Sequence, residues 1–183
     1  MEKWADRLDK EEQRLREQFA RSPYAVSFLR ERATFILVTL HVLFGEREAD
    51  RLAELQEIAD WMRDWAARSN RFHHNLLVLG DFNIDRQGSG GYQAFVSTGL
   101  RVPHVLLNLP RTIFDDPGKL DDDSFYDQIA WFETGSHALI DLQLRDGGNL
   151  NFMPHVYTDT NLTRNSISYR VSDHYPLWVE FAI

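Results

Sequence analysis

The chain contains no cysteine, which excludes disulfide bonds, thiolate metal sites and a cysteine nucleophile. It also lacks any apolar run of the roughly 18 to 20 residues that a membrane-crossing helix needs. Its N-terminus begins with charged residues rather than with the apolar core of a signal peptide. We therefore expect a soluble protein with no membrane span, in a reducing compartment such as the cytoplasm.

Basic residues are comparatively few. The 20 Lys and Arg are outnumbered by 28 Asp and Glu, so the formal net charge is -8. Affinity for a phosphate backbone comes largely from Lys and Arg that displace counterions, and this charge therefore disfavours broad electrostatic binding to nucleic acid. A polyanionic substrate would have to be held by local contacts or through a metal ion.

The chain does have ample material for a hydrophobic core. Hydrophobic residues make up 43% of its 183 residues, including 12 Phe, 6 Tyr and 5 Trp, so we expect one domain over residues 1–183. Helical spacing of apolar residues predicts an N-terminal helix over residues 1–20, a helix over residues 47–69 and a short helix near residues 92–96. Strands are expected at residues 24–28, 34–41, 76–79, 126–132, 138–144, 150–153 and 177–183, with a hairpin turn at 146–148 and a surface loop at 111–124.

Three apolar strands lie next to polar clusters. The clusters are Thr39-Leu40-His41, Gly80-Asp81-Phe82-Asn83-Ile84-Asp85, and Ser172-Asp173-His174-Tyr175-Pro176, which leads into the last strand. Polar groups on neighbouring strand ends leave the core together and can line one cleft. Carboxylates and amides without thiolates suit a hard cation such as Mg²⁺ or Mn²⁺.

Each cluster also has an ordinary explanation. Gly-Asp-Phe-Asn can be a turn in which Asp and Asn bond to the local backbone, and a lone histidine is more often structural than catalytic. The adjacent His73 and His74 point apart, so they are not expected to form a metal pair. The acidic run at residues 121–123 is typical of a solvated loop.

Taken together, the clusters resemble the endonuclease/exonuclease/phosphatase superfamily, the pancreatic deoxyribonuclease-like fold of metal-dependent phosphoesterases. The segments that match, in the family's order, are Arg21 to Phe28, Thr39 to His41, Leu79 to Asn83, Tyr126 to Ile129 and Ser172 to Pro176. The resemblance covers residues 21–183, which correspond to the C-terminal half or more of a family domain. It implies an α/β fold, a truncated four-layer αββα sandwich with two mostly antiparallel sheets.

The resemblance also assigns roles to individual residues. His174 would be the general base that takes a proton from the attacking water, and Asp127 would orient its ring. Asp81 would align that water or bind a metal ion. The catalytic set is then His174, Asp127, His41, Asp81 and Asn83, the metal contacts are Asp173 and Asp81, and the contacts to substrate phosphate are Asn83, Arg21 and His41.

Two of the family's motifs have no counterpart in this sequence. The family carries an Asn and a metal-binding Glu on strands that precede the segment matched by Arg21 to Phe28, and the residues before Arg21 resemble neither. We therefore expect a truncated family member with a weak or empty Mg²⁺ or Mn²⁺ site of about millimolar affinity, as two carboxylates make a poor hard-cation site. A sheet that has lost strands is expected to pair with another chain, as a homodimer or with a partner that supplies the missing strands.

Three functions from different classes remain open at this stage. The first is a metal-dependent phosphoesterase that hydrolyses phosphodiesters or phosphomonoesters, a nuclease among the options. The second is a catalytically impaired remnant that binds ligands bearing phosphate, and the third is an interaction module that pairs strands. The acidic charge disfavours long double-stranded DNA as the substrate, so nucleic acid is possible without being favoured.

Overall fold

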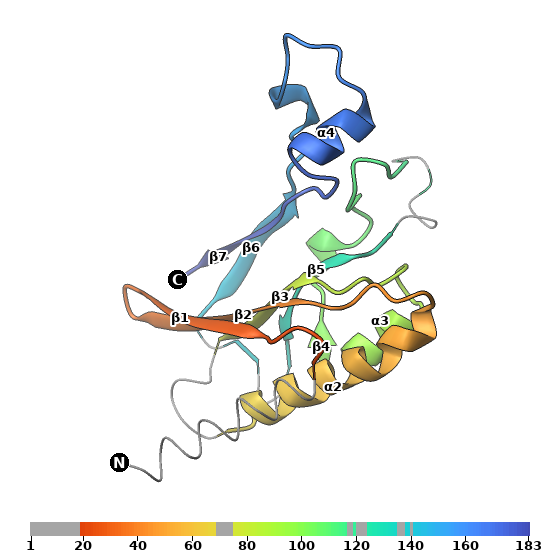
Figure 1. Cartoon of the computed structure of the whole chain (residues 1–183). Coiled ribbons are helices and arrows are strands. Elements are labelled where there is room, and N and C mark those ends of the chain that lie inside the picture. Colours follow the sequence, from red (N-terminus) through yellow and green to blue (C-terminus); the bar gives the residue numbers. More distant parts are fainter. Residues whose placement is uncertain (1–18, 69–74, 117–118, 120–123, 135–137, 140) are drawn as a thin grey trace, which may run out of the picture.

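The computed structural model describes residues 19–68, 75–116, 119, 124–134, 138–139 and 141–183 (Figure 1). The helix predicted over residues 1–20 lies almost wholly outside this range. The elements are β1 (Tyr24–Arg30), β2 (Ala33–His41), α2 (Glu48–Ala66), β3 (Leu76–Asp81), α3 (Gly90–Val96), β4 (Leu100–Arg101), the 3-10 turn η1 (His104–Leu106), β5 (Asp127–Phe132), β6 (Gln143–Asn149), the 3-10 turn η4 (Met153–His155), α4 (Arg164–Arg170) and β7 (Leu177–Ala182). None of the described helices combines the length and the apolar composition of a membrane-crossing helix.

The strands form a five-stranded sheet in the order β1-β2-β3-β5-β4 and a separate pair, β6-β7. Strands β2 and β3 run parallel and the other neighbours antiparallel, so the larger sheet is mixed. Helices α2 and α3 lie on one face of this sheet and the β6-β7 pair on the other (Figure 1). The described residues thus build three layers. The expected fourth layer of helices is not formed by them, since Trp178 and Glu180 on the outer face of β7 are exposed.

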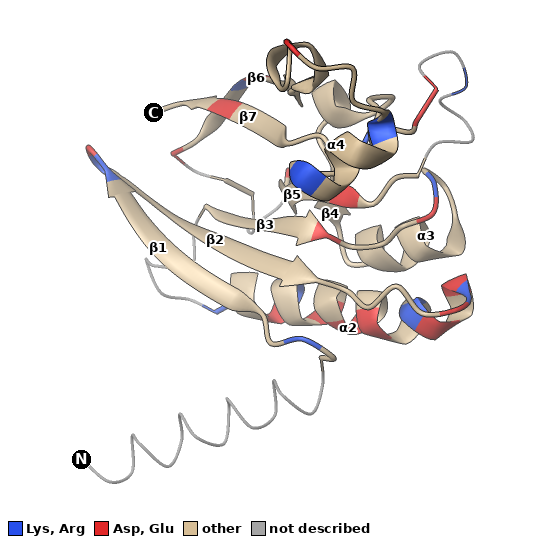
Figure 2. Ribbon diagram, turned by 45° about the horizontal axis from the view of Figure 1, so that its top comes forward, with Lys and Arg blue, Asp and Glu red and all other residues tan. Residues whose placement is uncertain are grey.

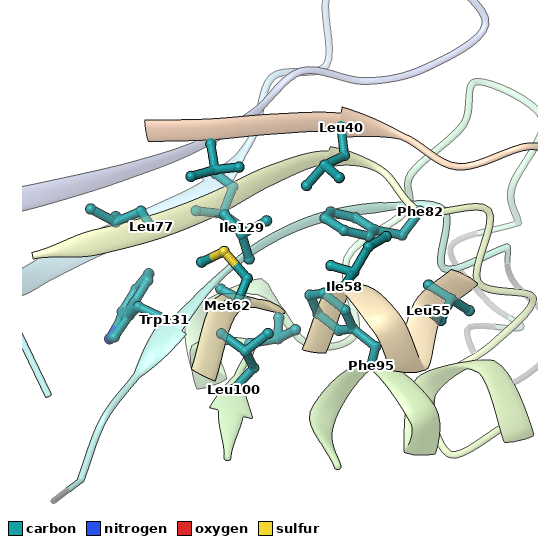
Figure 3. Packing of buried hydrophobic residues seen from close by; sticks show 14 of the residues in the cluster. Leu40, Leu55, Ile58, Met62, Leu77, Phe82, Phe95, Leu100, Ile129 and Trp131 are labelled. Atoms are coloured by element: carbon teal, nitrogen blue, oxygen red, sulfur yellow. The ribbon is translucent and has the colours of Figure 1, made fainter. Parts of the chain in front are cut away.

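The main core lies between the larger sheet and α2. Alternation along β2 directs Ile36, Val38 and Leu40 towards the helices, and all three are buried. On α2, Leu55, Ile58 and Met62 are three or four residues apart and fully buried, as the helical spacing predicts. Figure 3 shows the α2 side chains pointing towards the sheet, and the rings of Phe82 and Phe95 pack against each other with centroids 4.6 Å apart.

The C-terminal strands differ from the sequence-based prediction. The expected hairpin over residues 138–153 is wrong, because β6 runs straight through Gly147 and Gly148 and pairs with β7. A Cβ atom on Gly147 would lie 2.8 Å from Val105, and one on Gly148 would lie 3.2 Å from the Trp178 ring. The glycines therefore allow close packing instead of a turn. The polar helix α4 was not predicted at all, since its single buried residue, Ile167, leaves no apolar period to detect.

Gly80 allows the close approach of β2 and β3 beside the polar cluster. Its φ is +143°, and a Cβ atom there would lie 2.0 Å from the carbonyl oxygen of Leu40. We expect Gly80→Ala to lower the free energy of unfolding by about 2 to 3 kcal/mol, measured by chemical denaturation. Gly88→Ala is the matched control, because Gly88 also has a positive φ of +81° but nothing within 4 Å of its Cβ position. A loss as small as the roughly 1 kcal/mol expected for the control would contradict the steric explanation.

Candidate active site

Strand register brings three predicted polar residues into one row. His41 is the parallel partner of Asp81 across β2 and β3, and Asp81 is the antiparallel partner of Asp127 across β3 and β5. The red tip of β3 in Figure 2 marks the acidic end of the strand. The His41 Nε2 atom lies 3.6 Å from the Asp81 Oδ2 atom. The row exists because these strands end or begin at the same edge of the sheet.

The fourth predicted residue, His174, reaches this row from the loop before β7. Its Nδ1 atom lies 2.6 Å from Asp127 Oδ2, the separation of a short hydrogen bond. The loop is held by an antiparallel bridge between Thr112 and His174 and by a hydrogen bond from the His174 backbone N–H to Ser172 Oγ. The hydrogen bond to Asp127 raises the pKa of His174 to about 9, although burial acts in the opposite direction. With Nδ1 engaged, Nε2 is the ring nitrogen left for proton exchange.

Asp81 has an unusual electrostatic environment for a carboxylate. Its side chain is only 20% exposed, and burial is the main cause that raises its pKa above the usual range, with the nearby Asp127 charge acting in the same direction. The Asn83 backbone N–H donates to Asp81 Oδ1 at 2.9 Å and partly offsets this rise. A carboxylate beside a second carboxylate in a partly dry site favours a nearby positive charge.

Asn83 contacts the backbone more than the open site. It is buried, with a positive φ of 49°, and its side-chain Nδ2 donates to the carbonyl oxygen of Val42 at 2.7 Å. This bond ties the end of β3 to the residue that follows β2. The predicted bond from this amide to a substrate phosphate would have to use the second Nδ2 hydrogen.

The last two predicted residues fall in different places. Asp173 is exposed and lines a cavity of about 430 Å³ together with His174 and Tyr126. Arg21 is exposed and follows Ala20, whose backbone N–H donates to Glu54 on α2. The structure thus gathers His41, Asp81, Asn83, Asp127, Asp173 and His174, while Arg21 has no described contact with them.

Arg111 supports the site and was missed. The prediction of a surface loop from residue 111 is wrong at its start, because Arg111 is fully buried. Its guanidinium donates to the carbonyl oxygens of Asp127, Leu109 and Leu106 at 2.7 to 2.8 Å. Its own carbonyl accepts the backbone N–H of Tyr175, next to His174. Burial lowers the pKa of Arg111 to about 10. No sequence signal marks it, since an arginine among acidic residues is typical of a solvated loop.

Tyr126 is a second residue whose place the sequence did not reveal. Its ring stacks on the His174 ring, with centroids 5.8 Å apart and planes inclined by 26°. Phe44, which is 57% exposed, meets Tyr126 edge to face at 6.4 Å. The Tyr126 ring therefore flanks the imidazole on the side of the cavity.

The donor atoms suit part of a hard-cation shell. Asp81 and Asp173 offer carboxylate oxygens, which Mg²⁺ and Mn²⁺ prefer, with waters and substrate oxygens completing the shell. Within the described residues, no group of three or more Asp, Glu or His side chains is placed to hold a metal ion. The described residues thus offer oxygen donors of the kind that a hard cation prefers, but few of them.

No protein-family model matches the sequence. A curated relative, a deoxyribonuclease from Thioalkalivibrio sp. (strain K90mix), is 28% identical in an alignment of 177 positions that covers 90% of this chain and 44% of that protein. The crystal structure of an endonuclease/exonuclease/phosphatase family protein from Bacteroides thetaiotaomicron superposes with a TM-score of 0.54 at 19% identity, over 86% of this chain and 54% of that one.

A beta toxin from Staphylococcus aureus, solved with bound magnesium ions, superposes with a TM-score of 0.45 at 13% identity, over 85% of this chain and 56% of that one. This likeness is too low to extend the magnesium ions to the present chain. The chain spans about half the length of each of these three proteins. The mixed sheet, the added strand pair and the superposition agree with the sequence motifs. The chain therefore has part of the endonuclease/exonuclease/phosphatase fold.

Proposed function

We propose that the chain carries the water-activating half of a phosphoester hydrolase. The observation that supports this most directly is the short contact of 2.6 Å between His174 Nδ1 and Asp127 Oδ2, beside Asp81. Asp127 holds the imidazole so that the neutral ring accepts a proton at Nε2 from a water molecule that attacks phosphorus. The same carboxylate then stabilises the imidazolium that forms.

The other gathered residues supply orientation and charge. Asp81 aligns the attacking water or binds a metal ion, and His41 donates a proton or a hydrogen bond to a phosphate or leaving oxygen. Asp81 and Asp173 would hold a divalent cation, which supplies positive charge for the phosphate oxygens when bound. Because the chain has a net charge of -8, little of its surface can neutralise phosphate. The positive charge must therefore be supplied at the site itself.

The substrate we propose is a compact phosphodiester or phosphomonoester. The deoxyribonuclease name of the relative supports a phosphodiester, and the chain's acidic charge weighs against long double-stranded DNA. The rival is a remnant that binds phosphate ligands without turnover. It is favoured by the shortage of metal ligands among the described residues.

Calorimetric titration with Mg²⁺ and Mn²⁺, together with hydrolysis of bis(p-nitrophenyl) phosphate and p-nitrophenyl phosphate, tests the proposal. We expect saturable, metal-dependent turnover and millimolar affinity for the cation, since two carboxylates form a weak hard-cation site. Asp81→Asn and Asp173→Asn should remove the binding heat, and Asp159→Asn, at an exposed residue outside the cluster, should leave it unchanged.

Other outcomes of this experiment point elsewhere. Micromolar binding that survives both substitutions would assign the metal to residues outside the matched motifs. Phosphate binding without turnover, at any cation concentration, would favour the impaired remnant and overturn the hydrolase proposal.

A further inference from the structure

The β6-β7 pair leaves much of the larger sheet uncovered. Strand β7 packs over β5, where the Trp131 and Phe181 rings meet at 5.2 Å, and β6 lies on the β4 side, where Gly147 meets Val105. The sheet continues past β7 through β3, β2 and β1. An open cavity of about 710 Å³ lies where the larger sheet extends beyond β7. Its apolar lining includes Phe35, Leu37, Leu77, Leu79, Val179 and Phe181.

The apolar face extends beyond the cavity onto β1. Register pairs Phe28 with Phe35 and Val26 with Leu37, so these side chains share the face, and the two phenyl rings stack at 5.3 Å. Tyr24, on the same face by alternation, is 67% exposed, and Phe28 is 43% exposed. No part of the described chain covers these residues. A contiguous apolar face of this kind is typical of an interface.

Two strand edges border this face. Strand β1 ends the order of the larger sheet, and β7 has a described partner only in β6. Between Tyr24 and Leu29 the edge strand carries no charged residue and no proline, the devices that usually block edge pairing. The β7 edge has only Glu180 to protect it. Both edges are therefore open to further strand pairing.

We propose that a second copy of the chain covers this face, with the two-fold axis running along β2 and each β1 placed beside the partner copy's β7. The strands that β6-β7 leaves uncovered are β3, β2 and β1, and they would face the partner copy's β1, β2 and β3 in that order. Each sheet of the dimer then joins the larger sheet of one copy to the strand pair of the other. The match is closed at this face, because the two edges that border it, β1 and β7, and the apolar face of each copy are all used once.

The geometry selects this arrangement over the simplest alternative. Two copies whose β7 edges pair antiparallel, about a two-fold axis perpendicular to the strand pair, would not fit. Their larger sheets would share one layer, and each extends past its own β7 into the space of the partner's sheet. Pairing β1 with β7 avoids that overlap. Net charge does not favour the dimer, because two copies of net charge -8 repel each other. Association should therefore strengthen as added salt screens the repulsion.

Size-exclusion chromatography with light scattering tests the proposal at micromolar concentration. We expect twice the chain mass of 21.4 kDa. Phe28→Lys places a charge on the covered face and should raise the dimer dissociation constant by about 30-fold or more. Leu29→Lys is the matched control, because Leu29 is the next residue, is 72% exposed and points to the opposite face of β1. The control should keep the wild-type mass.

Hydrogen exchange locates the interface independently of the variants. Amides of both β1 and β7 should exchange at least about 10-fold more slowly at concentrations above the dissociation constant than below it. A monomer at 100 µM, or a dimer that Phe28→Lys leaves intact, overturns the proposal. A second result would also overturn the proposal: the chain stays a monomer, and its β1 and β7 amides become protected only when the part of the Thioalkalivibrio relative outside the match is added. That result would assign the face to a different chain. Each readout is independent of catalysis.

Discussion

Replacing His174 with glutamine is expected to lower kcat/KM for bis(p-nitrophenyl) phosphate by about 10³-fold. Glutamine keeps a polar side chain near Asp127 but cannot accept a proton from water, and general base catalysis contributes about 10² to 10⁴ in rate. Steady-state kinetics at saturating cation measures the effect. The control is His155→Gln, since His155 is an exposed histidine outside the cluster and its loss should leave the rate unchanged.

The pH dependence gives the same prediction a second readout. Only the neutral imidazole can act as a base, and the bond to Asp127 raises the pKa of His174 to about 9. The rate of the wild-type protein should therefore rise with pH through the neutral range and level off above the pKa. A cation held nearby would lower the midpoint without changing this sign. A rate that falls as pH rises through this range, or a variant with wild-type activity, would show that His174 is not the base.

Replacing Arg111 with methionine is expected to lower the free energy of unfolding by about 4 kcal/mol. The guanidinium satisfies three backbone carbonyl oxygens, those of Asp127, Leu109 and Leu106, in a fully buried position. Each buried acceptor left unpaired costs about 1 to 3 kcal/mol. Because burying the charge is itself costly, the net loss should fall in the lower part of the summed range. Thermal denaturation should show a decrease of roughly 8 to 16 °C in Tm.

A matched arginine separates this effect from a general loss of positive charge. Arg101 is exposed and also donates to a backbone carbonyl, that of Leu100, so Arg101→Met removes a similar side chain where water can replace the bond. We expect it to change the free energy of unfolding by less than about 0.5 kcal/mol. Equal effects of the two substitutions would refute the structural role of Arg111.

Local pattern was enough for several strands of the fold. The run Thr34 to His41 and the short run Leu76 to Leu79 predicted β2 and β3, because apolar, β-branched residues fill a sheet buried on one or both faces. His174 and Asp127 lie 47 positions apart, and their pairing was predicted through the family resemblance of their motifs; the structure places them 2.6 Å apart.

Other features depend on contacts between distant segments and leave no local signal. The glycines at 147 and 148 satisfy a turn pattern equally well, and only the approach of Val105 and Trp178 explains why they lie inside β6. Arg111 is buried where the nearby carbonyl oxygens of Leu106 and Leu109 meet that of Asp127, which lies 16 positions away in the chain. An isolated sequence window does not contain the distant partners Val105, Trp178 and Asp127, so propensity predicts the commoner outcome for each residue.

The sequence by itself determined the α/β class, the strand ends that carry polar groups and the acidic charge, since each depends on residue type and short-range spacing. The pairing of His174 with Asp127 was predicted by the family resemblance of their motifs. Only the tertiary structure decided that the larger sheet is mixed and that Asn83 bonds to the Val42 carbonyl. It also gives Arg21 no described contact with the cluster. It also decided which apolar face stays open. Register and layer order come from pairing segments far apart in the chain, and the free energy of that pairing depends on all the partners at once.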